Sequence, residues 1–103
     1  MKSEANTLKA TVDYLGHVKQ ILEIESPEQV EISTGGSIRD LLIKLAEKHG
    51  QAFKKTIYEP GSSDLKSNFI LTVNGLLLNQ LNGIETKLKD GDRIIFMPIV
   101  SGG

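Results

Sequence analysis

The sequence predicts a single α+β domain in which a mixed sheet of four to five strands packs on one long helix. Three features point to this class. The chain has 103 residues, enough for one modest hydrophobic core. Apolar residues alternate over residues 8–14 and 30–32, and one apolar stripe at helical spacing follows them. Asn74-Gly75, the strongest short signal of a β-hairpin, follows an apolar run.

The first third of the chain predicts two strands. From residue 8 to 14, apolar and polar side chains alternate, which is typical of a half-buried strand. Gly16 ends this strand, and we expect a short helical turn over residues 17–24. Residues 30–32 alternate again and predict the second strand.

The clearest element is a helix over residues 38–49. Ser37 is a favourable N-cap, and Gly50 stands where a C-cap belongs. The apolar residues between them form one stripe, made of Ile38, Leu41, Leu42, Leu45 and Ala46. Phe53 and Ile57 lie four residues apart and predict a short second helix.

The rest of the chain predicts a loop and three more strands. Residues 60–64 are rich in proline, glycine and serine and predict the loop. Residues 69–73 and 76–78 flank the Asn-Gly turn and are expected to pair as a hairpin. The turn at residues 90–92 precedes a last strand over residues 93–100, which is apolar at almost every position and therefore reads as a central strand.

This order of elements is that of the β-grasp, or ubiquitin-like, fold, with the first and last strands side by side in the middle of the sheet. We expect a flexible N-terminal arm over residues 1–7, a single β-grasp domain over residues 8–100 and a flexible Gly-Gly tail over residues 101–103.

Composition excludes several classes of function. Twelve basic and 13 acidic residues give a formal charge of −1, which argues against broad binding of nucleic acid or anionic membranes. The chain has no cysteine and two histidines far apart, so we expect no disulfide, thiol nucleophile or metal site. No apolar run approaches the ~20 residues of a membrane span, and the start lacks a signal-peptide pattern. We therefore expect a cytoplasmic protein.

Three further patterns have a plain structural interpretation. Asp90 and Asp92 flank a glycine, where aspartate is favoured for local backbone hydrogen bonds. The loop at residues 35–37 lacks the lysine of a phosphate-binding loop and the third glycine of a dinucleotide-binding loop. Residues 54–55 are a solvated lysine pair. We find no active site in these patterns and expect that the chain is not an enzyme on its own.

The sequence ends in Gly102 and Gly103 directly after the last strand. Two glycines carry no side-chain bulk, so such a tail can thread a narrow channel and place its carboxylate in another protein's active site. Adenylation by a partner would turn this carboxylate into a good electrophile. Residues 100–103, fully extended, reach about 13–14 Å.

Residues 88–103 resemble the end of the MoaD/ThiS-like family of ubiquitin-fold sulfur carriers, and most of all MoaD, the small subunit of molybdopterin synthase. The family's ending is L-x-D-G-D-x-[VI]-x-F-x-P-P-V-[SAT]-G-G, and this chain departs from it only at Ile99, which replaces the second proline. Residues 12–19, 37–42 and 73–75 also fit, so the resemblance spans about residues 8–103.

The resemblance implies a sulfur carrier. A MoeB-like, ubiquitin-activating-type enzyme would use ATP to adenylate Gly103, and sulfur would then replace one carboxylate oxygen to give a thiocarboxylate. A MoaE-like large subunit would hold the tail while sulfur is donated for molybdopterin, the molybdenum or tungsten cofactor. The chain itself would bind no cofactor. Open alternatives are a ubiquitin-like modifier joined to lysines through Gly103, a sulfur carrier for thiamine or tRNA thiolation, and a binding module with an incidental Gly-Gly end.

A partner is expected to cover the sheet face opposite the helix. If Ile94 and Phe96 face the helix, Ile95 and Met97 point the other way, although a strand that is apolar on both sides also allows the opposite assignment. The expected partner-binding residues are Leu15, Leu77, Ile95, Met97, Ile99, Val100 and Ser101. Leu15 is included because of the family resemblance.

Overall fold

The computed structural model of the protein describes residues 6–58 and 69–98. Most of the expected N-terminal arm, the expected loop at residues 60–64, the end of the expected last strand and the Gly-Gly tail lie outside the described residues.

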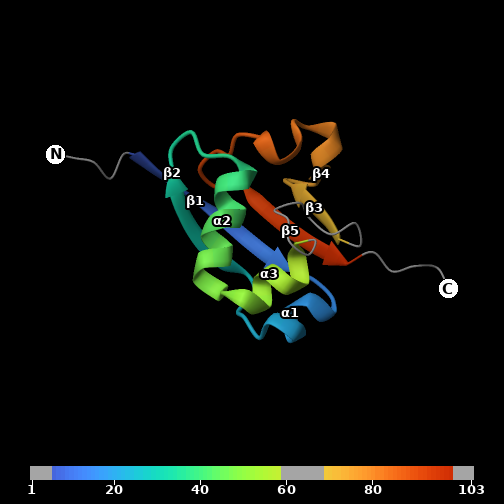
Figure 1. Cartoon of the computed structure of the whole chain (residues 1–103). Helices are drawn as coiled ribbons and strands as arrows, with labels where there is room; N and C mark the ends of the chain where they lie inside the picture. Colours follow the sequence, from blue (N-terminus) through green and yellow to red (C-terminus); the bar gives the residue numbers. More distant parts are fainter. Residues whose placement is uncertain (1–5, 59–68, 99–103) are drawn as a thin grey trace.

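Five strands and three α-helices make up the described chain (Figure 1). The strands are β1 (Thr7–Tyr14), β2 (Glu28–Ser33), β3 (Phe69–Val73), β4 (Leu76–Leu77) and β5 (Arg93–Pro98). The α-helices are α1 (His17–Leu22), α2 (Ile38–His49) and α3 (Gln51–Ile57). Two short 3₁₀ helices follow the hairpin, η2 (Leu78–Gln80) and η3 (Gly83–Glu85).

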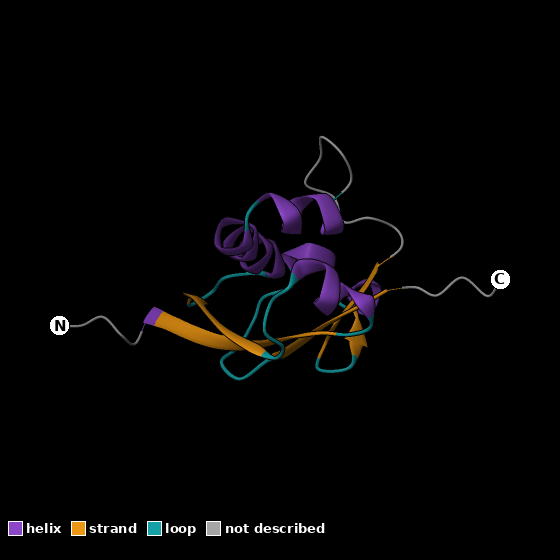
Figure 2. Ribbon diagram, turned by 90° about the horizontal axis from the view of Figure 1, so that it is seen from below, coloured by secondary structure: helices purple, strands orange, loops and turns teal. Residues whose placement is uncertain are grey.

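The strands form one mixed sheet in the order β2-β1-β5-β3-β4. The first and last strands, β1 and β5, lie parallel in its middle, and the other neighbours are antiparallel. The three α-helices lie on one side of the sheet, which leaves two layers (Figure 2). The β-grasp prediction is therefore confirmed, with α1 and α3 added to the one long helix that the sequence predicted.

Helix α2 begins where its capping residues place it. The Ser37 backbone N–H donates to Asp40 Oδ2 at 2.9 Å, and the Asp40 N–H donates to Ser37 Oγ at 3.4 Å, which closes a capping box. Gly50 has a φ of 78°, a conformation that glycine adopts without strain, and it ends the helix. The predicted bounds of this helix are confirmed.

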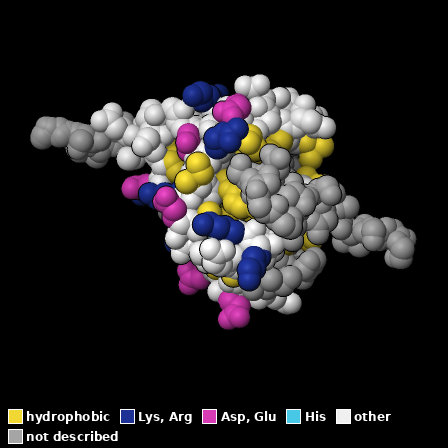
Figure 3. Space-filling model, viewed as in Figure 1, with side chains coloured by type: hydrophobic (Ala, Val, Ile, Leu, Met, Phe, Trp, Pro, Cys, Tyr) yellow, Lys and Arg dark blue, Asp and Glu magenta, His cyan; other side chains and the backbone are white. Residues whose placement is uncertain are grey.

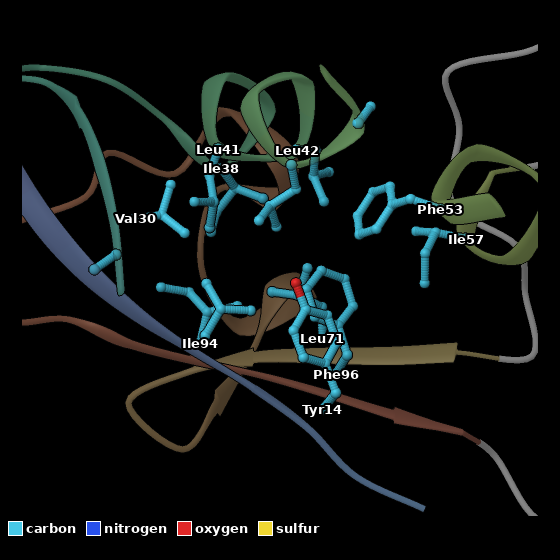
Figure 4. Close-up of a cluster of buried hydrophobic side chains, with 14 of the residues drawn as sticks. Tyr14, Val30, Ile38, Leu41, Leu42, Phe53, Ile57, Leu71, Ile94 and Phe96 are labelled. Carbon is cyan, nitrogen blue, oxygen red and sulfur yellow. The ribbon is translucent and has the colours of Figure 1, made fainter. Parts of the chain in front are cut away.

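The apolar stripe of α2 packs on the inner sheet face and closes a single core (Figure 4). Tyr14 and Phe96 lie on neighbouring strands with their rings stacked at 5.3 Å, and Phe53 of α3 meets Phe96 edge-on at 6.2 Å. These three rings are almost completely buried. They join β1 to β5 and the sheet to α3 in one hydrophobic unit.

The predicted Asn-Gly turn is confirmed, because Asn74 and Gly75 have φ values of 53° and 87°. The return strand is shorter than predicted. β4 stops at Leu77, whose N–H donates to Gln80 Oε1 at 2.9 Å, and Leu78 already begins η2. Because the chain turns back toward the core after Leu77, the half-buried Leu78 packs on the core instead of extending the strand along the edge of the sheet.

Replacing Asn74 by alanine is expected to lower the free energy of unfolding by about 1–2 kcal/mol. Its Oδ1 accepts from the Arg93 N–H and its Nδ2 donates to Asp92 Oδ1, both at 2.9 Å, so the side chain joins the hairpin to the start of β5. Urea unfolding would measure the change. Asn79→Ala is the control, because Asn79 is an exposed asparagine in η2, and this change should be nearly neutral. Equal losses of stability in both variants would contradict the role of Asn74.

Candidate functional site

The outer face of the sheet, opposite the α-helices, is the main candidate for a binding surface. Along β5 the exposure alternates: Ile94 and Phe96 are fully buried under α2 and α3, whereas Ile95 and Met97 are half-buried on the outer face. The structure thus adopts the first of the two face assignments that the sequence left open.

Neighbouring strands extend this apolar surface. Met97 lies opposite Ile70 of β3, and Ile95 lies opposite Thr72, which in turn lies opposite Leu77 of β4. Leu15 follows β1, and its N–H donates to the Phe96 carbonyl at 2.9 Å, which continues the parallel register beside Met97. We call the set the open apolar face; it consists of Leu15, Ile70, Leu77, Ile95 and Met97.

Two members of the open apolar face are strongly exposed. Leu15 is 40% and Leu77 is 39% accessible, and the other large exposed hydrophobic residues of the described chain are Ile43 on α2 and Leu76 in the hairpin. Apolar side chains that lie together and face solvent are typical of an interaction surface. The structure therefore brings together four of the residues proposed from the sequence, and it adds Ile70.

Ile70 was missed by sequence reasoning, although a signal for it existed. Leu71 and Val73 are buried and face the core, so alternation along β3 places Ile70 on the outer face. An apolar residue at an outer position of a strand is the same signal that identified Met97.

An ion pair borders the open apolar face at Ile95. Arg93 donates to Asp13 Oδ2, and Ser26 Oγ donates to Asp13 Oδ1 at 2.6 Å. The hydrogen bonds from Ser26 and Arg93 hold the pKa of Asp13 below its ordinary value, so the carboxylate stays ionised. The Arg93 side chain is 55% exposed and leaves part of its guanidinium available to a partner.

The predicted tail residues Ile99, Val100, Ser101, Gly102 and Gly103 lie outside the described residues. The chain leading to them is well held, because β5 pairs with β1 up to Phe96 and with β3 up to Pro98. Gly16 lies against this end of β5. It has a φ of 64°, and a Cβ there would lie 3.0 Å from Pro98 Cγ, so a bare backbone is needed for the close approach.

The aspartates of the last turn have the structural role expected of them. Asp90 Oδ1 accepts from the Lys9 N–H, and Asp92 Oδ2 accepts from the Lys89 N–H, both at 2.8 Å. Within residues 6–58 and 69–98, no three His, Cys, Asp or Glu side chains gather into a potential metal site. None of the helices in these two ranges is long and apolar enough to cross a membrane. On the helix-bearing side, basic and acidic side chains are interspersed (Figure 3).

Comparison with solved structures gives several chains of the same fold. SAMP1 of Haloferax volcanii matches with a TM-score of 0.78 at 17% identity, covering 92% of this chain and 99% of that one. A Pyrococcus furiosus protein assigned as molybdopterin converting factor, subunit 1, matches at 0.70 with 26% identity, covering 90% and 99%. The Amycolatopsis orientalis BexX/CysO complex contains a chain that matches at 0.69 with 21% identity, covering 91% and 99%.

Sequence comparison is more specific. No curated protein sequence matches the chain. The model of the ThiS family, however, matches residues 5–103, which is almost the whole sequence and includes both terminal glycines. The chain therefore belongs to the ThiS family of small ubiquitin-like carriers and modifiers.

Proposed function

We propose that the protein is a sulfur carrier for molybdopterin synthesis and acts as the small subunit of a molybdopterin synthase. The observation that carries the proposal is the family match, which runs through Gly102 and Gly103. The resemblance of residues 88–103 to MoaD and the 26% identity with the Pyrococcus furiosus protein favour the molybdopterin pathway over other sulfur pathways.

The chemistry takes place at the carboxylate of Gly103. One carboxylate oxygen attacks the α-phosphorus of ATP in the adenylating enzyme, pyrophosphate leaves, and an acyl-adenylate forms. Hydrosulfide then attacks the acyl carbon. AMP leaves with the former carboxylate oxygen, one proton is released, and Gly103 carries a thiocarboxylate. The chain contributes a reactive end without side-chain bulk, and its partners contribute the catalytic groups.

The open apolar face would dock the partner enzymes. Two of its residues, Ile95 and Met97, lie on β5, the strand that leads to the tail. Met97 stands one residue before the last described position. An enzyme that covers Met97 and Leu15 would therefore hold the chain close to the residues that must enter its active site. Ile99, Val100 and Ser101 would continue this contact along the tail.

Mass spectrometry of the full chain tests the proposal. We expect that incubation with an adenylating enzyme, ATP and sulfide replaces one oxygen by sulfur at the last residue, and that the product then serves a large synthase subunit. A tail that remains unchanged with an active adenylating enzyme would contradict the proposal. A thiocarboxylate that no large synthase subunit consumes would indicate a carrier for thiamine or tRNA thiolation.

The second candidate is a protein modifier. The fold likeness to SAMP1, which covers 92% of this chain, favours it. In that case lysates of the native host would contain slowly migrating conjugates, and digestion would leave a Gly-Gly remnant on lysines. Remnants without any thiocarboxylate would replace the carrier function with the modifier function.

Replacing Met97 by aspartate is expected to weaken binding to the adenylating enzyme by roughly tenfold or more, since it places a charge in the middle of a desolvated contact. Calorimetry would measure the affinity. Ile43→Asp is a matched control, because Ile43 is an exposed apolar residue, 49% accessible, on the opposite side of the molecule. Similar affinities of both variants would count against the open apolar face.

A further inference from the structure

Strand β2 forms one edge of the sheet, and half of its backbone groups face away from the molecule. In the β1–β2 ladder the Thr34 N–H donates to the Asn6 carbonyl. Every second pair along the ladder from there is also hydrogen-bonded, from Ile32 with Leu8 to Glu28 with Val12. In an antiparallel ladder, alternate residues of a strand face the same neighbour. The even-numbered residues of β2 therefore bond to β1, and the odd-numbered residues turn their backbone groups outward.

Hydrogen bonds on the other side of β1 agree with this assignment of the backbone groups of β2. The Thr11 and Leu15 N–H groups donate toward the β5 side, which leaves the even-numbered residues of β1 for β2. Among the outward-facing residues of β2, the Ser33 carbonyl accepts a hydrogen bond from the Gly36 N–H at 2.9 Å. Gln29 and Glu31 keep both backbone groups free of partners among the described residues. They form a short template for one more strand.

A hollow of about 360 Å³ lies beside this edge, between β2 and α2. Ile32 and Ser33 line it from the strand, and Asp40 and Lys44 line it from the helix. The Asp40 carboxylate is engaged by Ser37, whereas Lys44 has no ion-pair partner among the described residues. The hollow thus offers one apolar side chain, the largely buried Ile32, and one available positive charge, Lys44.

We propose that the edge of β2 binds an extended peptide segment of another protein, which adds to the sheet as a further strand. Its backbone bonds to Gln29 and Glu31. One apolar side chain of the peptide lies over Ile32, and an acidic side chain reaches Lys44. This chemistry defines the partner as an extended, apolar and acidic peptide.

A second copy of the chain fits this edge less well than such a peptide. Antiparallel pairing of two β2 edges centred on their free groups would set Glu31 opposite Gln29, which brings no opposite charge to either side chain. An acidic peptide instead gains from Lys44.

The site is separate from the tail. Ser33 pairs with Thr7 at the start of β1, whereas Pro98 lies at the other end of the sheet, past the level of Tyr14 (Figure 1). β2 is also separated from β5 by β1. A protein bound at the β2 edge therefore leaves the end of β5 and the open apolar face accessible. The proposal stands whether the tail carries sulfur or is joined to proteins.

Nuclear magnetic resonance of the isotope-labelled full chain tests the site with a short synthetic peptide in which valine alternates with threonine and aspartates stand at one end. We expect peptide-dependent amide shifts at Gln29, Glu31 and Lys44, and slower hydrogen exchange of the Gln29 and Glu31 amides. A control peptide with proline in place of the central valine lacks one N–H and should bind about tenfold more weakly.

Matched variants separate backbone from side-chain effects. Glu31→Pro removes an outward N–H at an edge position that tolerates proline and should weaken binding about tenfold, whereas Glu31→Ala keeps the N–H and should bind at least as well as the original chain. Lys44→Glu should weaken binding with a loss that shrinks at high salt, and Lys54→Glu on α3 should not.

Three results would overturn the proposal. These are peptide-dependent shifts that fall on Ile95 and Leu77 instead, the absence of shifts at the highest soluble peptide concentration, and equal binding by Glu31→Pro and Glu31→Ala. A chain that dimerises through β2 without peptide, as seen by analytical ultracentrifugation, would assign the edge to a second copy instead.

Discussion

Replacing Gly103 by alanine is expected to reduce thiocarboxylate formation by about a hundredfold while the melting temperature stays unchanged. The added methyl group would crowd a partner channel that accepts bare backbone, and a displacement of the reacting carboxylate by ~1 Å is enough for such a loss. Folding should not change, because β5 is held by β1 and β3 upstream of the tail. Gly102→Ala should have the same effect to a lesser degree.

The measurement is the fraction of chain that gains sulfur per unit time with the adenylating enzyme, ATP and sulfide. Glu47→Ala is the control, since Glu47 is exposed on α2, on the opposite side of the sheet from the open apolar face, and this variant should react as fast as the original chain. Deleting Gly102 and Gly103 should abolish the reaction and leave stability unchanged. A Gly103→Ala chain that accepts sulfur at the original rate would refute the steric role of the tail.

Local signals in the sequence predicted the elements well. Ser37 and Gly50 mark the ends of α2 through side-chain and backbone preferences that act within a few residues, and both ends are confirmed. The positive φ of Asn74 and Gly75 is equally local. Such features depend on the residues themselves and can be read without knowledge of distant partners.

The orientation of β5 needed information from distant parts of the chain. Every residue from Ile94 to Met97 is apolar, so alternation alone allows either face to be buried. The structure settles the choice by pairing, since Val12 lies beside Ile94 and Tyr14 beside Phe96. These β1 residues are the core-facing set, and their neighbours in β5 join them in the core.

The buried polar cluster around Glu28 was not foreseen, although its position in the strand indicates it. Glu28 precedes Val30 and Ile32 at steps of two residues, so alternation places its side chain on the core face. The predicted strand covers residues 30–32 only, so it does not include this carboxylate. Its partners come from β1 and α2, 14 and 21 positions away, which no local pattern reveals.

The Glu28 carboxylate joins three elements. Its Oε2 accepts from the Tyr14 hydroxyl at 2.7 Å and from His49 Nε2 at 2.8 Å, and its Oε1 accepts from Lys48 Nζ at 2.8 Å. The side chain is 8% exposed. Burial favours the neutral acid, yet the hydrogen bonds from Lys48, Tyr14 and His49 outweigh it and hold the pKa of Glu28 below its ordinary value of 4.5.

Replacing Glu28 by alanine is expected to lower the free energy of unfolding by about 3–5 kcal/mol, a large share of the stability of a domain this size. The buried Tyr14 hydroxyl and the largely buried His49 ring would each lose an acceptor. Glu31→Ala is the control on the same strand, because its side chain is exposed, and it should change stability by less than about 0.5 kcal/mol. Equal effects in urea unfolding would contradict the role of the cluster.

The pH dependence of stability gives a second, independent test of this carboxylate. Because folding lowers the pKa of Glu28, the ionised group stabilises the fold fully above pH 4.5, and this contribution is lost as the pH falls through the lowered folded value. Glu28→Gln should therefore be less stable at neutral pH and should lose less stability than the original chain on acidification below pH 4.5. Asp13, whose pKa is also lowered, is present in both proteins, so the difference between the two curves isolates Glu28. Parallel curves would show that Glu28 does not gain its ionised state from these hydrogen bonds.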